Sequence, residues 1–297
     1  MSRILKLNPV CKRIIWGGTR IPEEFGIGDG NVAEAWMLAL HDEGICGTDG
    51  GGSLKDFFEV PFPVMIKLID AQQKLSVQVH PEKTEMWYVV DCSEEAQLVY
   101  GLKEKFDESG MRRALREGTA ERLLNYVNVR KGDVFFIPQG LVHAIGEGIL
   151  IAEIQQNSNV TYRLYDYGRL QNGHPRQLHV DEAMHVIRDF SQEEIYQKRF
   201  SRGKISGDCL ANCEHFTVFE KKVFGREKIS AKGRSFVSVI VLEGQGKIGR
   251  RLFKKGDSFV LPAETTATLA SDSAEIIITE YAAHGNQKHP ADHKRKT

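Results

Sequence analysis

The chain of 297 residues is long enough for two domains of ordinary size or for one large all-β unit. Hydrophobic residues make up 41% and charged residues 27%, values typical of globular proteins, so a largely disordered chain is excluded. The 40 Lys and Arg residues balance the 40 Asp and Glu residues, and this zero net charge argues against partners recruited by an overall field, such as nucleic acid or an anionic membrane.

Cysteine use and the amino terminus bear on the cellular compartment. The five cysteines are scattered and include no C-x-x-C pair, which argues against a disulfide framework or a zinc knuckle and favours a reducing compartment. The first eight residues lack the apolar stretch of a signal peptide, and no run of about 18 apolar residues occurs. We therefore expect a cytoplasmic protein without a membrane-spanning segment.

Predicted strands dominate the first half of the chain. Residues 49–53 include three consecutive glycines and predict a loop. Short runs rich in Val, Ile, Phe and Tyr, separated by Gly, Pro and Asp, predict strands over about 60–100 and 127–168. Apolar residues at helical spacing predict a helix over 106–126, between these two stretches.

The second half repeats this pattern. A second helix is predicted over 180–198, and further strands are predicted over 216–282. Residues 285–297 are polar and basic, and we expect them to form a disordered tail.

One motif occurs twice. Residues 131–138 (KGDVFFIP) and 255–262 (KGDSFVLP) share the pattern K-G-D-x-F-x-x-P, and their first residues lie 124 positions apart. Each copy predicts a tight turn at Gly-Asp and a strand that ends at proline, because proline has no backbone donor. The pattern resembles the second conserved motif of cupins. We therefore expect a mainly β fold of two cupin-type jelly-roll barrels with a small helical insertion.

The two copies differ where a metal ligand would stand. His143 lies five residues beyond the proline of the first copy, whereas Ala267 takes that place in the second. Gln78 and His80 alternate on a predicted strand and so share a face, and Glu85 follows after a turn. Two imidazoles, a carboxylate and an amide suit a borderline divalent ion such as zinc, with an open position for water or substrate. The pattern predicts one metal ion per chain.

These features divide the chain into three predicted segments. Residues 1–200 would form a metal-binding catalytic barrel, with the helical insertion near 104–127. Residues 201–284 would form a second, metal-free barrel, and residues 285–297 the tail.

Charged residues also interrupt apolar and aromatic stretches. Lys67 lies within the apolar run 64–69, and a buried lysine needs an anionic partner. Arg163 lies between large side chains, where its planar guanidinium can bind a phosphate or stabilise an oxyanion. An anionic ligand would account for both residues.

Several motifs, in a fixed order, resemble type I phosphomannose isomerases in their short bacterial form. They are residues 15–18 (IWGG), 33–36 (AEAW), 66–70 (IKLID), 75–81 (LSVQVHP), 83–88 (KTEMWY), 143–146 (HAIG) and 161–166 (TYRLYD). The resemblance runs from about residue 8 to at least residue 190. The predicted second barrel fits the second cupin of that family.

The resemblance implies a zinc-dependent isomerase that interconverts mannose 6-phosphate and fructose 6-phosphate, so the implied partner is a hexose 6-phosphate. The residues that match the family's metal ligands are Gln78, His80, Glu85 and His143. Those that match its catalytic groups are Arg163, Lys83 and Glu153, and those that match its phosphate-binding groups are Lys67, Ser76 and Arg169. The reaction needs a group that moves a proton between C1 and C2, and either Glu153 or Lys83 could serve.

Two other functions fit part of the pattern. Two histidines and a carboxylate also bind iron in cupin oxygenases, but that function leaves the basic residues Lys67, Arg163 and Arg169 unexplained. A sugar-phosphate-binding protein without activity is suggested by two departures from the family pattern. These are a short loop at Glu82 and Asn159, where the family commonly has aspartate.

Overall fold

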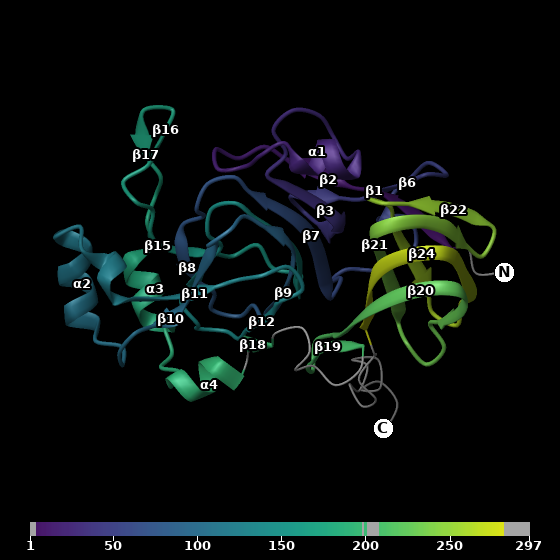
Figure 1. Cartoon of the computed structure of the whole chain (residues 1–297). Coiled ribbons are helices and arrows are strands. Elements are labelled where there is room, and N and C mark those ends of the chain that lie inside the picture. The colour runs from purple at the N-terminus through teal and green to yellow at the C-terminus, as the bar shows by residue number, and fades with distance from the viewer. Residues whose placement is uncertain (1–3, 198, 201–207, 282–297) are drawn as a thin grey trace, which may run out of the picture.

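Two large antiparallel sheets organise the computed structural model, which describes residues 4–197, 199–200 and 208–281 (Figure 1). In spatial order, the first sheet contains β18 (Arg199–Phe200), β12 (Val134–Ile137), β9 (Glu85–Cys92), β14 (Ile149–Gln156), β7 (Val64–Ala71), β3 (Glu34–Leu38) and β2 (Val10–Lys12). The second contains β19 (Cys209–Asn212), β20 (Thr217–Ser230), β24 (Thr266–Tyr281), β21 (Phe236–Ile248), β23 (Ser258–Pro262), β1 (Leu5–Asn8) and β6 (Gly47–Thr48), and β22 (Arg251–Lys254) pairs with β21.

Shorter strands and helices complete the two units. A smaller sheet runs β11 (Leu124–Asn128), β10 (Gln97–Leu102), β13 (His143–Ala144), β8 (Val77–Val79) and β15 (Tyr162–Tyr165). Two hairpins are formed by β4 (Leu40–His41) with β5 (Gly44–Ile45) and by β16 (Leu170–Gln171) with β17 (His174–Pro175). The helices are α1 (Arg20–Phe25), α2 (Glu108–Arg116), α3 (Val180–Val186) and α4 (Gln192–Gln197), with 3-10 turns η1 (Leu54–Asp56) and η2 (Ala120–Leu123). None of the helices in these described ranges is long and apolar enough to cross a membrane.

The motif that occurs twice forms the same structure in both places. Gly132 and Gly256 adopt φ of 86° and 88°, a conformation that glycine tolerates. Each glycine donates its backbone N–H to the carbonyl of a valine, Val89 in β9 and Val241 in β21. The strand order β12-β9-β14-β7 in the first sheet matches β23-β21-β24-β20 in the second. The mainly β fold of two barrels is therefore confirmed.

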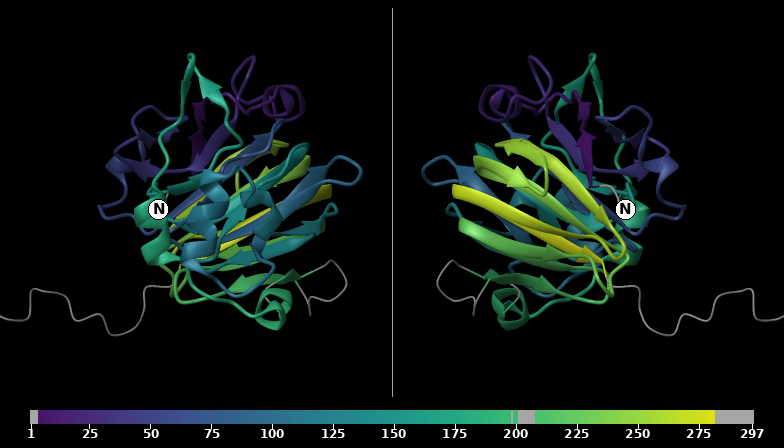
Figure 2. Two further views of the ribbon diagram at one scale, coloured as in Figure 1. Left: turned by 90° about the vertical axis from the view of Figure 1, so that its left-hand side faces the viewer. Right: turned by 90° about the vertical axis from the view of Figure 1, so that its right-hand side faces the viewer.

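Alternation along β9 directs its side chains to two different cores. Met86 and Tyr88 face the large hydrophobic core between the two sheets, which also contains Phe236 and Ile240 of β21. Trp87 points the other way, into the interior of the first barrel. Viewed from either end, the two units lie one behind the other (Figure 2). The interior of the first barrel is therefore separate from the large hydrophobic core between the two sheets.

The predicted helices are shorter in the structure. Over 106–126 only α2 is an α-helix, because Gly118 adopts a φ of 69° and the residues from Leu124 onward pair with β10 as β11. Over 180–198 the structure has α3 and α4 in place of one helix.

The pairing of strands at the amino terminus bears on the predicted division of the chain. β1 pairs with β23, so the first described residues add a strand to the sheet of the carboxy-terminal unit. The boundary at residue 200 stays a prediction, and the predicted tail 285–297 lies outside the described residues.

Candidate metal centre and active site

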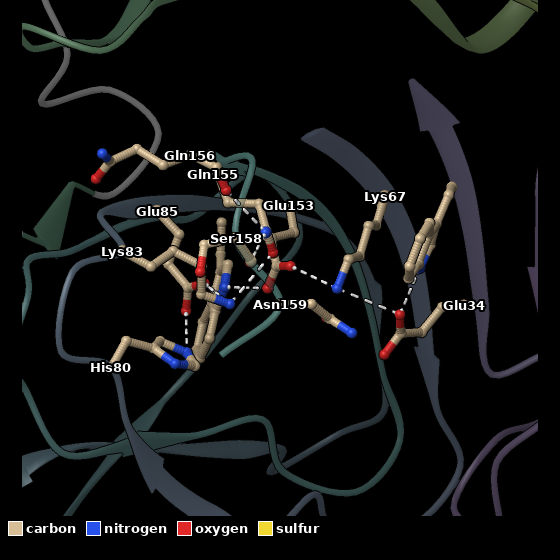
Figure 3. Close-up of polar contacts among 12 residues, drawn as sticks. Glu34, Lys67, His80, Lys83, Glu85, Glu153, Gln155, Gln156, Ser158 and Asn159 are labelled. Atoms are coloured by element: carbon tan, nitrogen blue, oxygen red, sulfur yellow. Dashed lines mark hydrogen bonds and ion pairs between the residues drawn. The ribbon is translucent and has the colours of Figure 1, made fainter. Parts of the chain in front are cut away.

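The four predicted metal ligands meet inside the first barrel, and Figure 3 labels two of them, His80 and Glu85. Gln78 and His143 lie directly opposite each other on β8 and β13, His80 follows β8, and Glu85 begins β9. The Oε1 atom of Glu85 lies 3.2 Å from Nε2 of His143 and 3.6 Å from Nε2 of His80. The amide nitrogen of Gln78 lies 3.4 Å from Nε2 of His143.

Backbone carbonyls set the orientation of both imidazoles. Nδ1 of His80 lies 2.9 Å from the Val160 carbonyl, and Nδ1 of His143 lies 2.8 Å from the Leu141 carbonyl. Since a carbonyl can only accept, each Nδ1 carries the proton and each Nε2 presents a lone pair. The two Nε2 atoms lie 3.2 Å apart, so their lone pairs converge beside Glu85.

This donor set fits a divalent cation. Glu85 is fully buried, and neither of its oxygens accepts a hydrogen bond of ordinary geometry, although the Lys83 ammonium lies 3.1 Å from Oε2. Burial alone would raise the pKa of Glu85, but Lys83 and the imidazoles hold it well below its usual range. Burial and the charge of Lys83 lower the pKa of His80 to about 3, which keeps its ring neutral. A carboxylate and two imidazole Nε2 atoms facing one point would be stabilised by a cation between them.

A cavity adjoins Gln78, His80, Glu85 and His143, which we call the metal group. Its volume of about 460 Å³ is suited to a small ligand. Gln78 and Lys83 connect the two, because both line the cavity. The other charged residues that line it are Glu34, Lys67, Glu153, Arg163 and Arg176. The cavity is therefore suited to an anionic, polar ligand.

One wall of the cavity holds a chain of buried ion pairs (Figure 3). Nζ of Lys67 lies 3.3 Å from Oε2 of Glu34 and 3.6 Å from Oε1 of Glu153. Glu153 accepts a hydrogen bond of 3.0 Å from the Trp87 indole at its other oxygen. β3, β7 and β14 bring these residues together, because Lys67 pairs with Trp36 on one side and with Glu153 on the other.

The pKa values of the two carboxylates beside Lys67 are shifted in opposite directions. Burial would raise the pKa of Glu34, but Lys67 outweighs burial and lowers it. The pKa of Glu153 is raised, first by burial and then by the negative charge of Glu85. Lys67 itself has a raised pKa, since these carboxylates outweigh the effect of its burial. Glu153 is therefore the carboxylate poised to exchange a proton.

A cluster of arginines forms the opposite side of the cavity. Arg163 donates to Ser76 Oγ at 3.3 Å and to the Gln177 carbonyl at 2.7 Å. Arg176, beyond the β16–β17 hairpin, donates to Asp166 at 2.7 Å. Arg169 also binds Asp166 but is not among the residues that line the cavity.

The structure thus brings nine of the ten predicted site residues to the metal group or the cavity wall, and places Arg169 behind the wall. Sequence reasoning missed Glu34 and Arg176. Glu34 had a visible signal, because it is a charged residue at the start of the apolar run 35–40. Arg176 had none, because residues 171–177 around it contain no apolar run for the charge to interrupt.

The second barrel carries apolar residues at the corresponding positions. Glu85 pairs with Ile137 in the seventh place of the first motif copy, and Val237 pairs with Leu261 in the seventh place of the second. Across the sheet, the counterparts of Glu153, Lys67 and His143 are Ile278, Phe219 and Ala267. These residues contribute to one hydrophobic cluster, so this interior is packed where the first barrel is polar.

Comparisons with known proteins agree over nearly the whole chain, although no family model matches it. The chain is 35% identical over 311 residues to mannose-6-phosphate isomerase ManA of Bacillus subtilis, covering 93% of this chain and 98% of the relative. It is 32% identical to a mannose-6-phosphate isomerase of Streptococcus mutans, covering 97% of this chain and 100% of the relative. The crystal structure of the mannose 6-phosphate isomerase from Bacillus subtilis superposes with a TM-score of 0.79 at 28% identity, covering 94% of this chain and 99% of that one. The chain belongs to the mannose-6-phosphate isomerase family.

Proposed function

We propose that this chain interconverts mannose 6-phosphate and fructose 6-phosphate, with zinc held by Gln78, His80, Glu85 and His143. The observation that carries the proposal is the buried Glu85 carboxylate facing two imidazole lone pairs at the end of a charged cavity. The family relationship supports the same reaction. When bound, the ion would polarise substrate oxygens as a Lewis acid and stabilise negative charge in the enediolate. A cytoplasmic location stays a prediction.

We assign the proton transfer between C2 and C1 to Glu153. Its carboxylate lines the cavity, Trp87 orients one oxygen, and its pKa is raised. A base of raised pKa is better matched to removing a weakly acidic C–H proton. Lys83 is the alternative, but its ammonium is committed to Glu85 at 3.1 Å and to Gln155 at 3.3 Å. Its role in this proposal is to balance the charge of Glu85.

The phosphate group would lie at the arginine side of the cavity. Arg163 and Ser76 present a guanidinium and a hydroxyl there, and Arg176 adds a second guanidinium. Lys67 contributes positive charge from the opposite wall. Arg169 acts from behind the wall, because it shares Asp166 with Arg176.

Arg176→Ala is expected to raise the KM for mannose 6-phosphate by roughly 10- to 100-fold, because a hydrogen bond to a charged group contributes about 1.5–3 kcal/mol. Arg169→Ala should produce a smaller rise, since it acts through Asp166. Initial-rate kinetics on the phosphorylated sugar would measure both. The control is Arg112→Ala, which removes an arginine of α2 that pairs with Asp181 away from the cavity. Equal use of mannose and mannose 6-phosphate by the unaltered chain would contradict a phosphate site.

The test of the function is a coupled assay on mannose 6-phosphate with the zinc-loaded chain, run in deuterated water. We expect isomerisation with at least partial incorporation of deuterium at C1 or C2, because a proton held on a carboxylate can exchange with solvent before it returns. Binding of hexose phosphates without turnover would instead indicate a non-catalytic sugar-phosphate-binding protein. Consumption of dioxygen would indicate an oxygenase.

A further inference from the structure

The segment of residues 157–160, which joins β14 to β15, contacts the active site through two of its backbone carbonyls. The Val160 carbonyl lies 2.9 Å from Nδ1 of His80. The Ser158 carbonyl accepts a hydrogen bond of 2.7 Å from the side-chain amide of Gln155. These two bonds set the direction of one metal-binding imidazole and of one buried amide.

The side chain of Gln155 connects the segment to Lys83 through hydrogen bonds. Its side chain is fully buried, and its Nε2 donates to the carbonyls of Ser158 and Gln156. Because both protons of the amide are used there, Oε1 faces Nζ of Lys83 at 3.3 Å. Gln155 thus bridges Ser158 and Lys83, and all three are labelled in Figure 3.

The other two residues of the segment hydrogen-bond to the β4–β5 hairpin, and one of them, Asn159, also lines the cavity. Asn157 donates to the Leu40 carbonyl at 2.9 Å, and Asn159 donates to Oε2 of Glu43 at 2.8 Å. The hairpin is itself fixed, because Lys12 donates to the Glu43 carbonyl at 2.6 Å and stacks over the Trp36 ring. The segment is therefore held between the hairpin and the metal group.

We propose that Asn159 and Glu43 are positioning residues for the metal centre. Their hydrogen bond pins the segment to the hairpin, and the pinned segment keeps the Val160 carbonyl against His80 and the Ser158 carbonyl against Gln155. The pair is directional, because the carboxylate can only accept and the amide nitrogen can only donate. This inference rests on the proposed function, which assigns His80 to the metal.

The test is a double-mutant cycle read out as zinc affinity, measured by competition between the chain and a chromophoric chelator. Asn159→Asp replaces the donor with a second carboxylate facing Glu43. Since a partner of a metal-bound histidine is worth about 10- to 100-fold in metal affinity, a loosened partner should weaken zinc binding by about tenfold. Glu43→Gln in the same chain supplies a new donor to the new carboxylate. Because the hydrogen bond between the two positions is then restored, zinc affinity should return to within about threefold of the parent value.

Two further variants separate positioning from charge. Asp42→Asn, one residue before Glu43, changes the net charge equally but supplies no donor to position 159, so it should not restore an Asn159→Asp chain. Asn159→Ala removes the donor without adding a carboxylate to the cavity wall; it should also weaken zinc binding, and Glu43→Gln should not rescue it. The same pattern is expected in kcat/KM.

Additive effects of Asn159→Asp and Glu43→Gln would overturn the proposal, as would unchanged zinc affinity in Asn159→Asp and Asn159→Ala. Such a result would leave the proposed function intact. If the unaltered chain itself bound no zinc, the proposed function would fail, and the inference with it, before any variant was compared. The two failures are therefore distinguishable.

Discussion

Replacing His143 with alanine is expected to abolish tight zinc binding and to lower kcat/KM by at least about 10³-fold. The Nε2 atom of His143 is fully buried and lies 3.2 Å from Glu85, so its loss leaves the carboxylate with one imidazole. Lewis-acid stabilisation is worth several kcal/mol, and each 1.4 kcal/mol is about tenfold in rate. Elemental analysis of the dialysed chain and initial rates on mannose 6-phosphate would measure the two effects.

The same measurement tests where the metal binds. We expect one zinc ion per parent chain and none in the chain carrying both His80→Ala and His143→Ala, because apolar residues such as Val237 and Ala267 occupy the corresponding positions of the second barrel. His215→Ala is the control, since it removes a histidine that contacts Glu214 outside the site. Two tightly held ions per chain, or undiminished zinc in the double variant, would refute a single site in the first barrel.

Glu153→Gln is expected to lower kcat by about 10²- to 10⁴-fold, the usual contribution of a general base, while zinc content stays at the parent value. Glutamine keeps an acceptor for the Trp87 indole and nearly the same volume, so the fold should persist. The pKa of Glu153 is raised by burial and by Glu85, and the base must be ionised. The acidic limb of the kcat/KM profile should therefore lie above the usual glutamate range, with activity lost as the pH falls, and should disappear in the variant.

Two companion variants decide whether the effect belongs to proton transfer. Glu34→Gln removes a carboxylate whose Oε2 lies 3.3 Å from Nζ of Lys67, on the side opposite Glu153. It should lower kcat much less than Glu153→Gln does. Lys83→Met removes the ammonium that faces Glu85 and should act mainly on zinc affinity. If Glu34→Gln and Glu153→Gln were equally damaging, the charge of the network would explain the loss. If Lys83→Met lost turnover with zinc retained and Glu153→Gln did not, the base would be Lys83.

The helix predicted over 106–126 is longer than α2 for a physical reason. Apolar residues at 123, 124 and 127 continue the helical spacing of α2, yet Leu124 and Val127 belong to β11, where Leu124 pairs with Leu102 of β10. Spacing alone does not distinguish a helix from a turn followed by a strand, and here the edge of a sheet was available to pair the chain.

The sequence by itself determined the mainly β fold in two barrels and the set of residues that meet at the metal group. Both depend on short-range regularities: alternation places Gln78 and His80 on one face, and the repeated Gly-Asp turn sets where each barrel strand begins. The tertiary structure alone decided which charges pair. Contacts between distant strands and loops pair Lys67 with Glu153. They also place Arg176, and not Arg169, in the cavity lining. Such contacts depend on strand register and loop path, which no local pattern of residues encodes.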